Sequence, residues 1–166
     1  MGHKPTLYFF VYTTIVNTLI LQGEISMGAL TNYLESGLIN HLFRGIPYTA
    51  PSTLYIGLTK SFNSGNLESG IADEPTSGSY ARQSYPVSTS SWIAPYTSGT
   101  SMITHNTSAI EFPIATANIG DISGVFIADS LTSGNITLYG ALSSSRNIRE
   151  GDQFVFSSGS LKISLN

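Results

Sequence analysis

The sequence predicts a mostly β fold: a single β-sandwich or jelly-roll-like domain with one short N-terminal amphipathic helix. Apolar residues recur at helical spacing only between residues 30 and 42, whereas from residue 54 onward short stretches alternate between apolar and polar residues. Glycine- and serine-rich turns separate these stretches. The 166 residues are enough for one such domain, preceded by an N-terminal extension over residues 1–26.

The helix is predicted over residues 30–44. Gly45 follows it as a stop signal, and Pro47 prevents its continuation. Gly37 lowers helix propensity by about 1 kcal/mol relative to Ala, so we expect packing on the sheet to hold the helix. His41 is interpreted as a core-edge histidine with a local hydrogen bond. The apolar stripe, at three- and four-residue spacing, consists of Leu30, Tyr33, Leu34, Leu38, His41 and Leu42.

Seven further segments are predicted as short strands. The most continuously apolar of them, Ile122–Ala128, is expected to be a central strand. In the last segment, Leu161, Ile163 and Leu165 are expected to face inward, with Lys162 and Ser164 facing outward. The predicted strands are residues 54–58, 80–85, 109–114, 122–128, 136–142, 154–156 and 161–165.

Two longer segments are predicted to be irregular. Residues 60–79 are rich in Ser, Gly, Asn and acidic residues, and residues 88–99 contain the only tryptophan, Trp92. Loops longer than about 12–15 residues in compact domains are usually functional or mobile. Residues 60–79 are therefore expected to be a functional or mobile loop.

The composition excludes several classes of function. The chain has no cysteine, which excludes disulfides and thiolate chemistry. Charged residues make up 10% of it, against roughly 25% in an average soluble domain, and the formal net charge is −3. Lys and Arg form no cluster, so no nucleic-acid partner is expected. A surface of hydroxyl and amide groups suits β-rich extracellular or virion proteins.

The first 26 residues allow four interpretations. An apolar run of about 15 residues from Leu7 to Leu21 is shorter than the roughly 20 that a transmembrane helix needs, so a membrane anchor is not favoured. A secretory leader is the second interpretation: the segment has a cation followed by an apolar run, as leaders do, but it lacks a clear cleavage site. Translation beginning at Met27 is the third interpretation. The fourth is an arm that docks on a neighbouring subunit, anchored by Tyr8, Phe9, Phe10 and Val11.

No catalytic or metal-binding motif stands out. The sequence lacks a Gly-x-Ser-x-Gly elbow, a Walker loop, a His-Glu-x-x-His pair and a Gly-x-Gly-x-x-Gly loop. The three histidines, His3, His41 and His105, lie in separate segments without metal-ligand spacing, and His105 is expected at the surface. We therefore expect no enzymatic activity, no cofactor and no metal.

The acidic residues include the residue types of two kinds of site. Glu68, Asp73 and Glu74 have the ligand type of a calcium site, but solvated loop acids are the favoured interpretation. Glu111 and Asp129 are the residue types of a glycosidase pair, yet their spacing gives that role no support.

Seven blocks of the sequence carry a family resemblance: Leu30–Glu35, Leu42–Gly45, Tyr48–Tyr55, Gly78–Gln83, Ala109–Pro113, Leu138–Leu142 and Ser158–Ile163. In this order they resemble small virion proteins of tailed bacteriophages, which are commonly labelled phage tail fibre proteins. The resemblance covers about residues 27–166 and leaves out the N-terminal 26. It brings no catalytic or ligand residues.

The resemblance implies a non-enzymatic structural protein of a tailed-phage virion. Such a protein is an exterior accessory, either a capsid decoration (cement) protein or a tail-fibre component. It acts by self-association, often as a homotrimer, and by docking on a capsid or tail protein. The alternative is a carbohydrate- or receptor-binding module with Tyr85, Trp92 and Tyr96 as stacking platforms. A position on head, neck or tail is left open.

Overall fold

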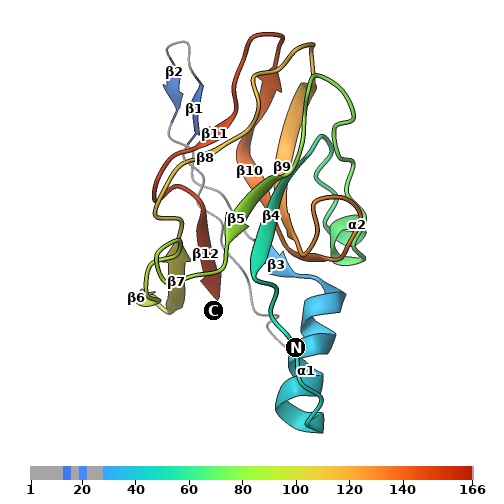
Figure 1. Ribbon diagram of the computed structural model, residues 1–166, viewed down its shortest axis with the longest axis vertical. Helices are drawn as coiled ribbons and strands as arrows, with labels where there is room; N and C mark the ends of the chain where they lie inside the picture. The colour runs from blue at the N-terminus through green and yellow to red at the C-terminus, as the bar shows by residue number, and fades with distance from the viewer. Residues whose placement is uncertain (1–12, 16–18, 22–27, 166) are drawn as a thin grey trace.

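A computed structural model describes residues 13–15, 19–21 and 28–165 of the chain (Figure 1). Within these residues, three antiparallel sheets and two short helices build a β-sandwich-like domain. The predicted fold class is therefore confirmed.

The largest sheet has five strands in the order β3-β10-β9-β4-β5. Strand β9 is central, as its apolar sequence predicts, and its pairing with β4 places Phe126 opposite Gly57. The bounds are β3 Gly28–Leu30, β4 Thr53–Thr59, β5 Gln83–Pro86, β9 Gly120–Ala128 and β10 Ile136–Ile148.

Both faces of this sheet are covered, which explains why β9 is apolar along most of its length. On one face Ile56, Leu58 and Val125 pack with aromatic rings from the segments around β8 (Ile110–Glu111) and β11 (Val155–Phe156). The other face buries Phe126 and Tyr139 under Leu67 of α2. The aromatic rings that close the first face are Phe112, Phe154 and Phe156.

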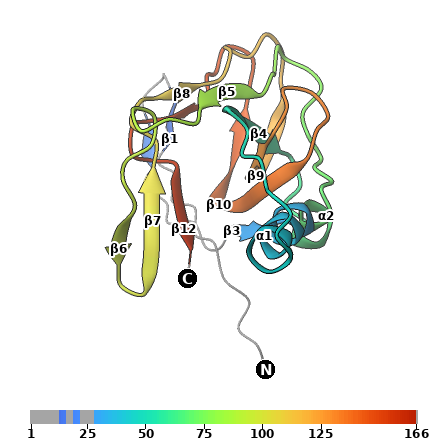
Figure 2. The same cartoon turned by 60° about the horizontal axis from the view of Figure 1, so that its bottom comes forward.

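Two smaller sheets complete the domain. One contains β2 (Leu19–Leu21), β1 (Thr13–Ile15), β11 and β8, with Thr13 opposite Phe156. The other contains β12 (Lys162–Leu165), β7 (Ser101–His105) and β6 (Tyr96–Ser98). Figure 2 shows β6 and β7 on one side of the domain and the two helices on the other.

Helix α1 runs from Asn32 to Arg44, close to the predicted range. Thr31 begins it: its hydroxyl accepts from Leu34 N–H and donates to the Ile136 carbonyl at 2.5 Å, which ties the helix to β10. The helix contacts β3 and β10 of the sheet, but the apolar stripe is not buried there as expected, because α1 buries none of its residues. The adjoining strand β3 has three residues, so the helix extends past the sheet edge (Figure 1).

Several other predictions need correction. The predicted loop 60–79 contains α2, Ser64–Glu68, whose start is capped by the Asn63 side chain. The predicted irregular segment 88–99 contains β6. The strand expected over residues 80–85 is β5, which begins only at Gln83 because Tyr80 turns its hydroxyl toward β4. Similarly, the strand expected over 109–114 is only Ile110–Glu111.

The predicted orientation of the last strand is also partly wrong. Ser164 is buried, whereas Leu165 is exposed. Ser164 pairs with Ile103, and both lie on the covered face of the three-stranded sheet, while Leu165 pairs with Met102 on the opposite face. The burial of the side chains of β12 is thus set by the face of the paired strand β7 and not by the apolar alternation in the sequence of β12.

Candidate functional site

The C-terminal end of α1 is an exposed apolar surface. We call Ile39, Leu42, Phe43 and Ile46 the helix end. Their side chains are 56%, 71%, 81% and 49% exposed. Such a cluster on one protruding element is unusual, since soluble proteins scatter their exposed apolar side chains.

Local hydrogen bonds fix the backbone conformation of the helix end. Gly45 adopts a left-handed conformation with φ 67°, and the backbone N–H groups of Gly45 and Ile46 both donate to the Asn40 carbonyl. Arg44 Nη1 donates to Asn40 Oδ1 at 2.8 Å. Past the turn, the Tyr48 N–H donates to His41 Nδ1 at 3.3 Å, which confirms the predicted local hydrogen bond of His41. His41 itself is exposed rather than at a core edge.

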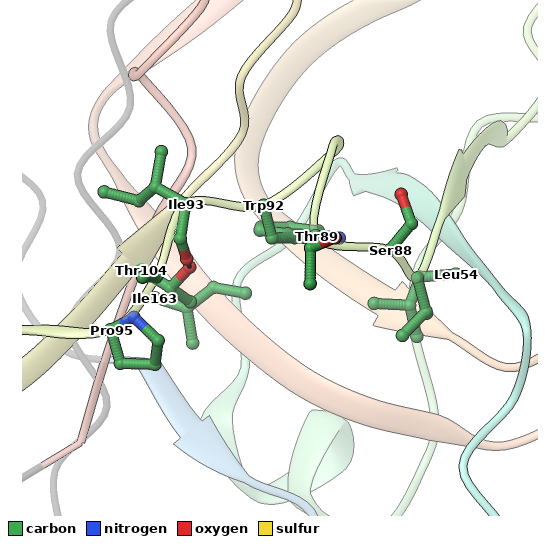
Figure 3. Close-up of a pocket in the computed structure, with 10 residues that line it drawn as sticks. Leu54, Ser88, Thr89, Trp92, Ile93, Pro95, Thr104 and Ile163 are labelled. Atoms are coloured by element: carbon green, nitrogen blue, oxygen red, sulfur yellow. Dashed lines mark hydrogen bonds between the residues drawn. The ribbon is translucent and has the colours of Figure 1, made fainter.

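The second surface is an apolar groove of about 630 Å³ between the five-stranded and three-stranded sheets (Figure 3). Trp92 lies in it, with Leu54 on one side and Ile163 on the other. The groove, as we use the term, is lined by Leu54, Val87, Ser88, Thr89, Trp92, Ile93, Ala94, Pro95, Thr104 and Ile163.

The three proposed stacking residues occupy different environments. Trp92 is partly exposed in the groove, and its Nε1 donates to the Pro86 carbonyl at 3.1 Å. Tyr85 meets the Trp92 ring edge-on at 5.2 Å between centroids but is itself 5% exposed. Tyr96 lies against His105, on the face of its sheet that carries Ile103. The structure thus brings Tyr85 and Trp92 together and leaves Tyr96 apart.

The hydroxyl of Tyr85 has a structural role. It accepts from the N–H groups of Thr107 and Ser108 and donates to the Ser91 carbonyl at 2.8 Å. Burial alone would raise the pKa of Tyr85, but the hydrogen bonds from Ser108 and Thr107 outweigh burial and lower it. Tyr85 therefore fixes the backbone beneath Trp92.

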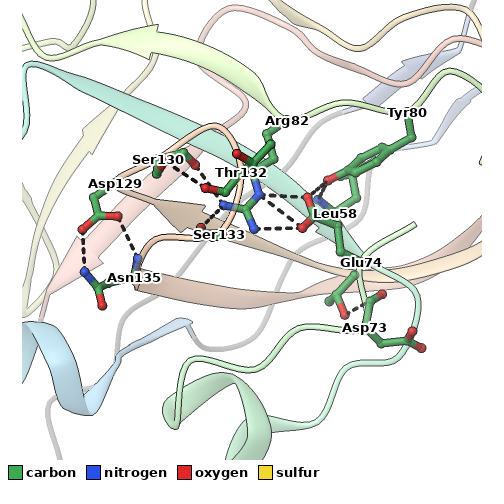
Figure 4. Close-up of polar contacts among 11 residues, drawn as sticks. Leu58, Asp73, Glu74, Tyr80, Arg82, Asp129, Ser130, Thr132, Ser133 and Asn135 are labelled. Atoms are coloured by element: carbon green, nitrogen blue, oxygen red, sulfur yellow. Dashed lines mark hydrogen bonds and ion pairs between the residues drawn. The ribbon is translucent and has the colours of Figure 1, made fainter. Parts of the chain in front are cut away.

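A polar cluster joins the 60–82 segment to the β9–β10 hairpin (Figure 4). Arg82 forms a salt bridge with Glu74, with Nη2 and Oε2 2.9 Å apart, and its Nη1 donates to the carbonyls of Ser130 and Ser133. Tyr80 donates to Glu74 Oε1 at 2.8 Å and accepts from the Leu58 N–H. Arg82, Glu74 and the Tyr80 hydroxyl thus all bond to other groups of the protein, which indicates a structural cluster.

Burial raises the pKa of Tyr80 well above its usual value, and the nearby Glu74 carboxylate adds to this effect. The hydroxyl therefore stays protonated and continues to donate to Glu74. Glu74 is not the solvated loop acid that the sequence predicts, because it is paired with Arg82.

The remaining candidates show no convergent site. Among the residues that the structure describes, no group of three or more His, Asp or Glu side chains could hold a metal ion. Asp129 accepts from the backbone and side chain of Asn135, which closes the β9–β10 hairpin. His105 is partly exposed, and its Nδ1 lies 3.2 Å from the Asn106 carbonyl oxygen.

Tyr8, Phe9, Phe10 and Val11, the predicted anchors of an N-terminal arm, lie outside the described residues. The helix end and the groove were not singled out by sequence reasoning. Of the helix end, only Leu42 belongs to the predicted apolar stripe; Ile39 and Phe43 lie beside that stripe, and Ile46 follows the predicted stop at Gly45. The groove had no signal in the sequence, because its walls come from four separate segments.

Neither of the two helices in the described part of the chain has the length and apolar character that crossing a membrane requires. No curated protein matches the chain.

A family model does match. Residues 29–164 match the model of the family described as Podophage GP4 fiber I protein gp80. This match confirms the resemblance to tailed-phage fibre proteins that the sequence blocks indicated. Because the match spans most of the chain, the protein belongs to this family of podophage fibre proteins and is a component of the virion.

Proposed function

We propose that the chain is a non-enzymatic structural accessory on the outside of the virion, a capsid decoration protein or part of a fibre. It acts by self-association and by docking on a capsid or tail protein. The observation that carries this proposal is the helix end: α1 buries no residue, and its Ile39, Leu42 and Phe43 are exposed together with Ile46, which follows the turn at Gly45.

A partner protein would stabilise this surface. Burying a Leu, Ile or Phe side chain contributes about 1.5–3 kcal/mol. An isolated helix of fewer than about 12–15 residues is marginal in water, and α1 has 13 residues with contacts mainly to β3 and β10. Docking would therefore cover the apolar side chains and hold the last turns of α1 at the same time.

The test is occupancy on phage particles. Leu42→Glu with Phe43→Glu should lower the number of copies on purified particles by at least about tenfold, since each side chain contributes more than the 1.4 kcal/mol that equals a factor of ten. Because both residues are exposed, the domain should keep its thermal midpoint. The control is Ile114→Glu, a 59% exposed apolar residue far from α1, which should keep full occupancy. Full occupancy of the double variant would refute the proposal.

The N-terminal extension is proposed as a second anchor. Its aromatic residues Tyr8, Phe9 and Phe10, with Val11, would bind a neighbouring subunit. Deleting residues 1–12, which keeps β1 and β2, should leave the domain folded and reduce occupancy; unchanged occupancy would remove these residues from the account.

A carbohydrate- or receptor-binding module is the second candidate, and the partly exposed Trp92 in an open apolar groove favours it. Trp92→Ala should then abolish binding on a glycan array while Tyr96→Ala, on the other sheet face, leaves it. Absence of any glycan binding by the parent chain would dismiss this candidate.

A further inference from the structure

A second cavity, of about 310 Å³, lies at the first turn of α1, at the other end of the helix from the helix end. The last residues of α2 and the β9–β10 hairpin form its other walls. None of its residues lines the groove around Trp92, so the two cavities are separate. We call it the polar pocket, after four of its lining residues: Asn32, Tyr33, Glu68 and Asn135.

Hydrogen bonds fix the hairpin wall of the polar pocket. Asn135 donates from its backbone N–H to Asp129 Oδ1 at 2.7 Å and from its Nδ2 to Asp129 Oδ2 at 2.8 Å (Figure 4). Arg82 Nη1 donates to the carbonyls of Ser130 and Ser133 in the same hairpin. The Asn135 side chain is therefore already oriented, and its Oδ1 remains as an acceptor. A wall that is ordered before binding reduces the entropy that a ligand must overcome.

The polar pocket combines hydrogen-bond acceptors with donors. Glu68 supplies a carboxylate and Asn135 an amide oxygen. The first backbone hydrogen bond of α1 runs from the Glu35 N–H to the Thr31 carbonyl, so the N–H groups of Asn32 and Tyr33 precede it, as donors without an intrahelical acceptor. The side-chain amide of Asn32 adds further donors. This mixture suits hydroxyl groups, because a hydroxyl both donates and accepts.

The same lining disfavours other classes of ligand. None of the described residues that line the polar pocket is cationic, and the Glu68 carboxylate offsets the positive end of the α1 dipole, so phosphate and other anions gain little there. Glu68 is also the one acidic residue of this lining, and no group of three metal-ligating side chains occurs in the described part of the chain. An apolar ligand would bury the amide and carboxylate groups without hydrogen bonds, which is costly.

We infer that the polar pocket binds one unit of a neutral saccharide. Hydroxyl groups of the sugar bond to Glu68, Asn32 and Asn135, and Tyr33, which is 44% exposed, supplies an aromatic ring for the apolar face of the sugar. The volume of about 310 Å³ lies at the lower end of the range of ligand pockets, which limits the ligand to a single unit. The site goes beyond the proposed function, since it uses neither the helix end nor Trp92.

Titration with free monosaccharides tests the polar pocket. Glucose, galactose, rhamnose and N-acetylglucosamine are added in turn to the isotope-labelled full chain, and NMR follows the backbone amide shifts. At least one sugar should give saturable shifts at Tyr33, Gly70 and Asn135, with a Kd of about 1 mM for so small a ligand. Glu68→Gln should weaken this binding at least about tenfold, because hydrogen bonds to a charged group are the stronger ones. Tyr33→Ala should weaken it about fivefold.

Tyr96→Ala, at a 40% exposed tyrosine of β6, and Trp92→Ala, in the groove, are the controls and should keep the parent Kd. Thermal midpoints report folding, and Asn32→Ala replaces Glu68→Gln if that variant fails to fold. Three outcomes overturn the inference: no shifts with any of the four sugars, binding that Trp92→Ala removes, or a Glu68→Gln variant that binds like the parent.

Particle occupancy separates this inference from the proposed function. If the Leu42→Glu, Phe43→Glu double variant loses occupancy while the parent chain binds none of the four sugars, docking through the helix end stands and the saccharide site is refuted.

Discussion

Arg82 donates hydrogen bonds from two of its nitrogen atoms to the Glu74 carboxylate. Its Nε lies 2.9 Å from Oε1 and 3.2 Å from Oε2, and its Nη2 lies 2.9 Å from Oε2. The guanidinium also lies over the ring of Phe126, 5.0 Å from its centroid. This one pair therefore connects the 60–82 segment, the β9–β10 hairpin and the buried face of β9. The cation adds to the other contacts of this segment, among them the hydrogen bond from the Leu58 N–H to the Tyr80 hydroxyl and that from the Phe62 N–H to Ser123.

Arg82→Met should destabilise the domain by about 2–3 kcal/mol. The change leaves Glu74 without its cation and frees the carbonyls of Ser130 and Ser133. The value is below the 3–5 kcal/mol of fully buried pairs because the Glu74 side chain is 25% exposed. Urea unfolding measures the loss, and the exposed Arg149→Met should stay within about 0.5 kcal/mol of the parent. Equal stability of both variants would show that the pair contributes nothing.

Stability should fall with rising pH above about 10. The folded state raises the pKa of Tyr80, so the unfolded chain releases this proton first. The contribution of Tyr80 is therefore complete below pH 10 and is lost as the pH rises further. Tyr80→Phe should lower stability at pH 8 but flatten the decline to pH 11. Tyr85→Phe should steepen the decline, because the pKa of Tyr85 is lowered. An unchanged slope in Tyr80→Phe would contradict this account.

Asn106→Ala should cost about 3–4 kcal/mol. The Asn106 side chain is fully buried and makes three hydrogen bonds: Nδ2 donates to Ser108 and Ser157 carbonyls, and Oδ1 accepts from Leu161 N–H at 2.8 Å. Alanine removes these partners from the Ser108 carbonyl and the Leu161 N–H, whereas the Ser157 carbonyl keeps its hydrogen bonds from Ser160. The matched control is the exposed Asn66→Ala, expected within about 0.5 kcal/mol of the parent in chemical denaturation.

Gly57→Ala should destabilise the domain by about 2–3 kcal/mol, as overpacking of a buried site does. A Cβ at position 57 would lie 2.2 Å from Cζ of Phe126, which is fully buried and unable to retreat. Gly65→Ala is the control, because its nearest contact is 3.6 Å away and alanine favours helix α2 by about 0.5–1 kcal/mol. The thermal unfolding midpoint should fall for Gly57→Ala and rise for Gly65→Ala. An unchanged midpoint in Gly57→Ala would show that the sheet can shift to accommodate the added methyl group.

The sequence predicted the elements whose pattern is set locally. Helix α1 has apolar residues at helical spacing and a stop at Gly45, and β9 has an apolar run that requires cover on both faces. The family blocks also identified the class of protein. Helix α2 was missed because its five residues are too few for a periodic pattern and only Leu67 is buried.

Contacts between residues in different elements could be predicted less well from the sequence. The apolar stripe of α1 indicates that something covers it, but not whether the cover belongs to the same chain. Glu74 was predicted to be solvated because Arg82, its partner, lies eight residues away and is brought close by the turns between them. The groove combines residues from Leu54 to Ile163, so only the fold reveals it.

The most direct measurement is the reactivity of a thiol at the helix end on intact particles. Ile46→Cys and, as a reference, Glu150→Cys are exposed in the isolated domain, and the chain has no other cysteine. If a partner covers the helix end on particles, the Ile46→Cys thiol should react with a bulky maleimide at least about tenfold more slowly than the Glu150→Cys thiol. In denatured chains the two thiols should react at the same rate. Equal rates on intact particles would show that the helix end is bare on the virion and would contradict docking through α1.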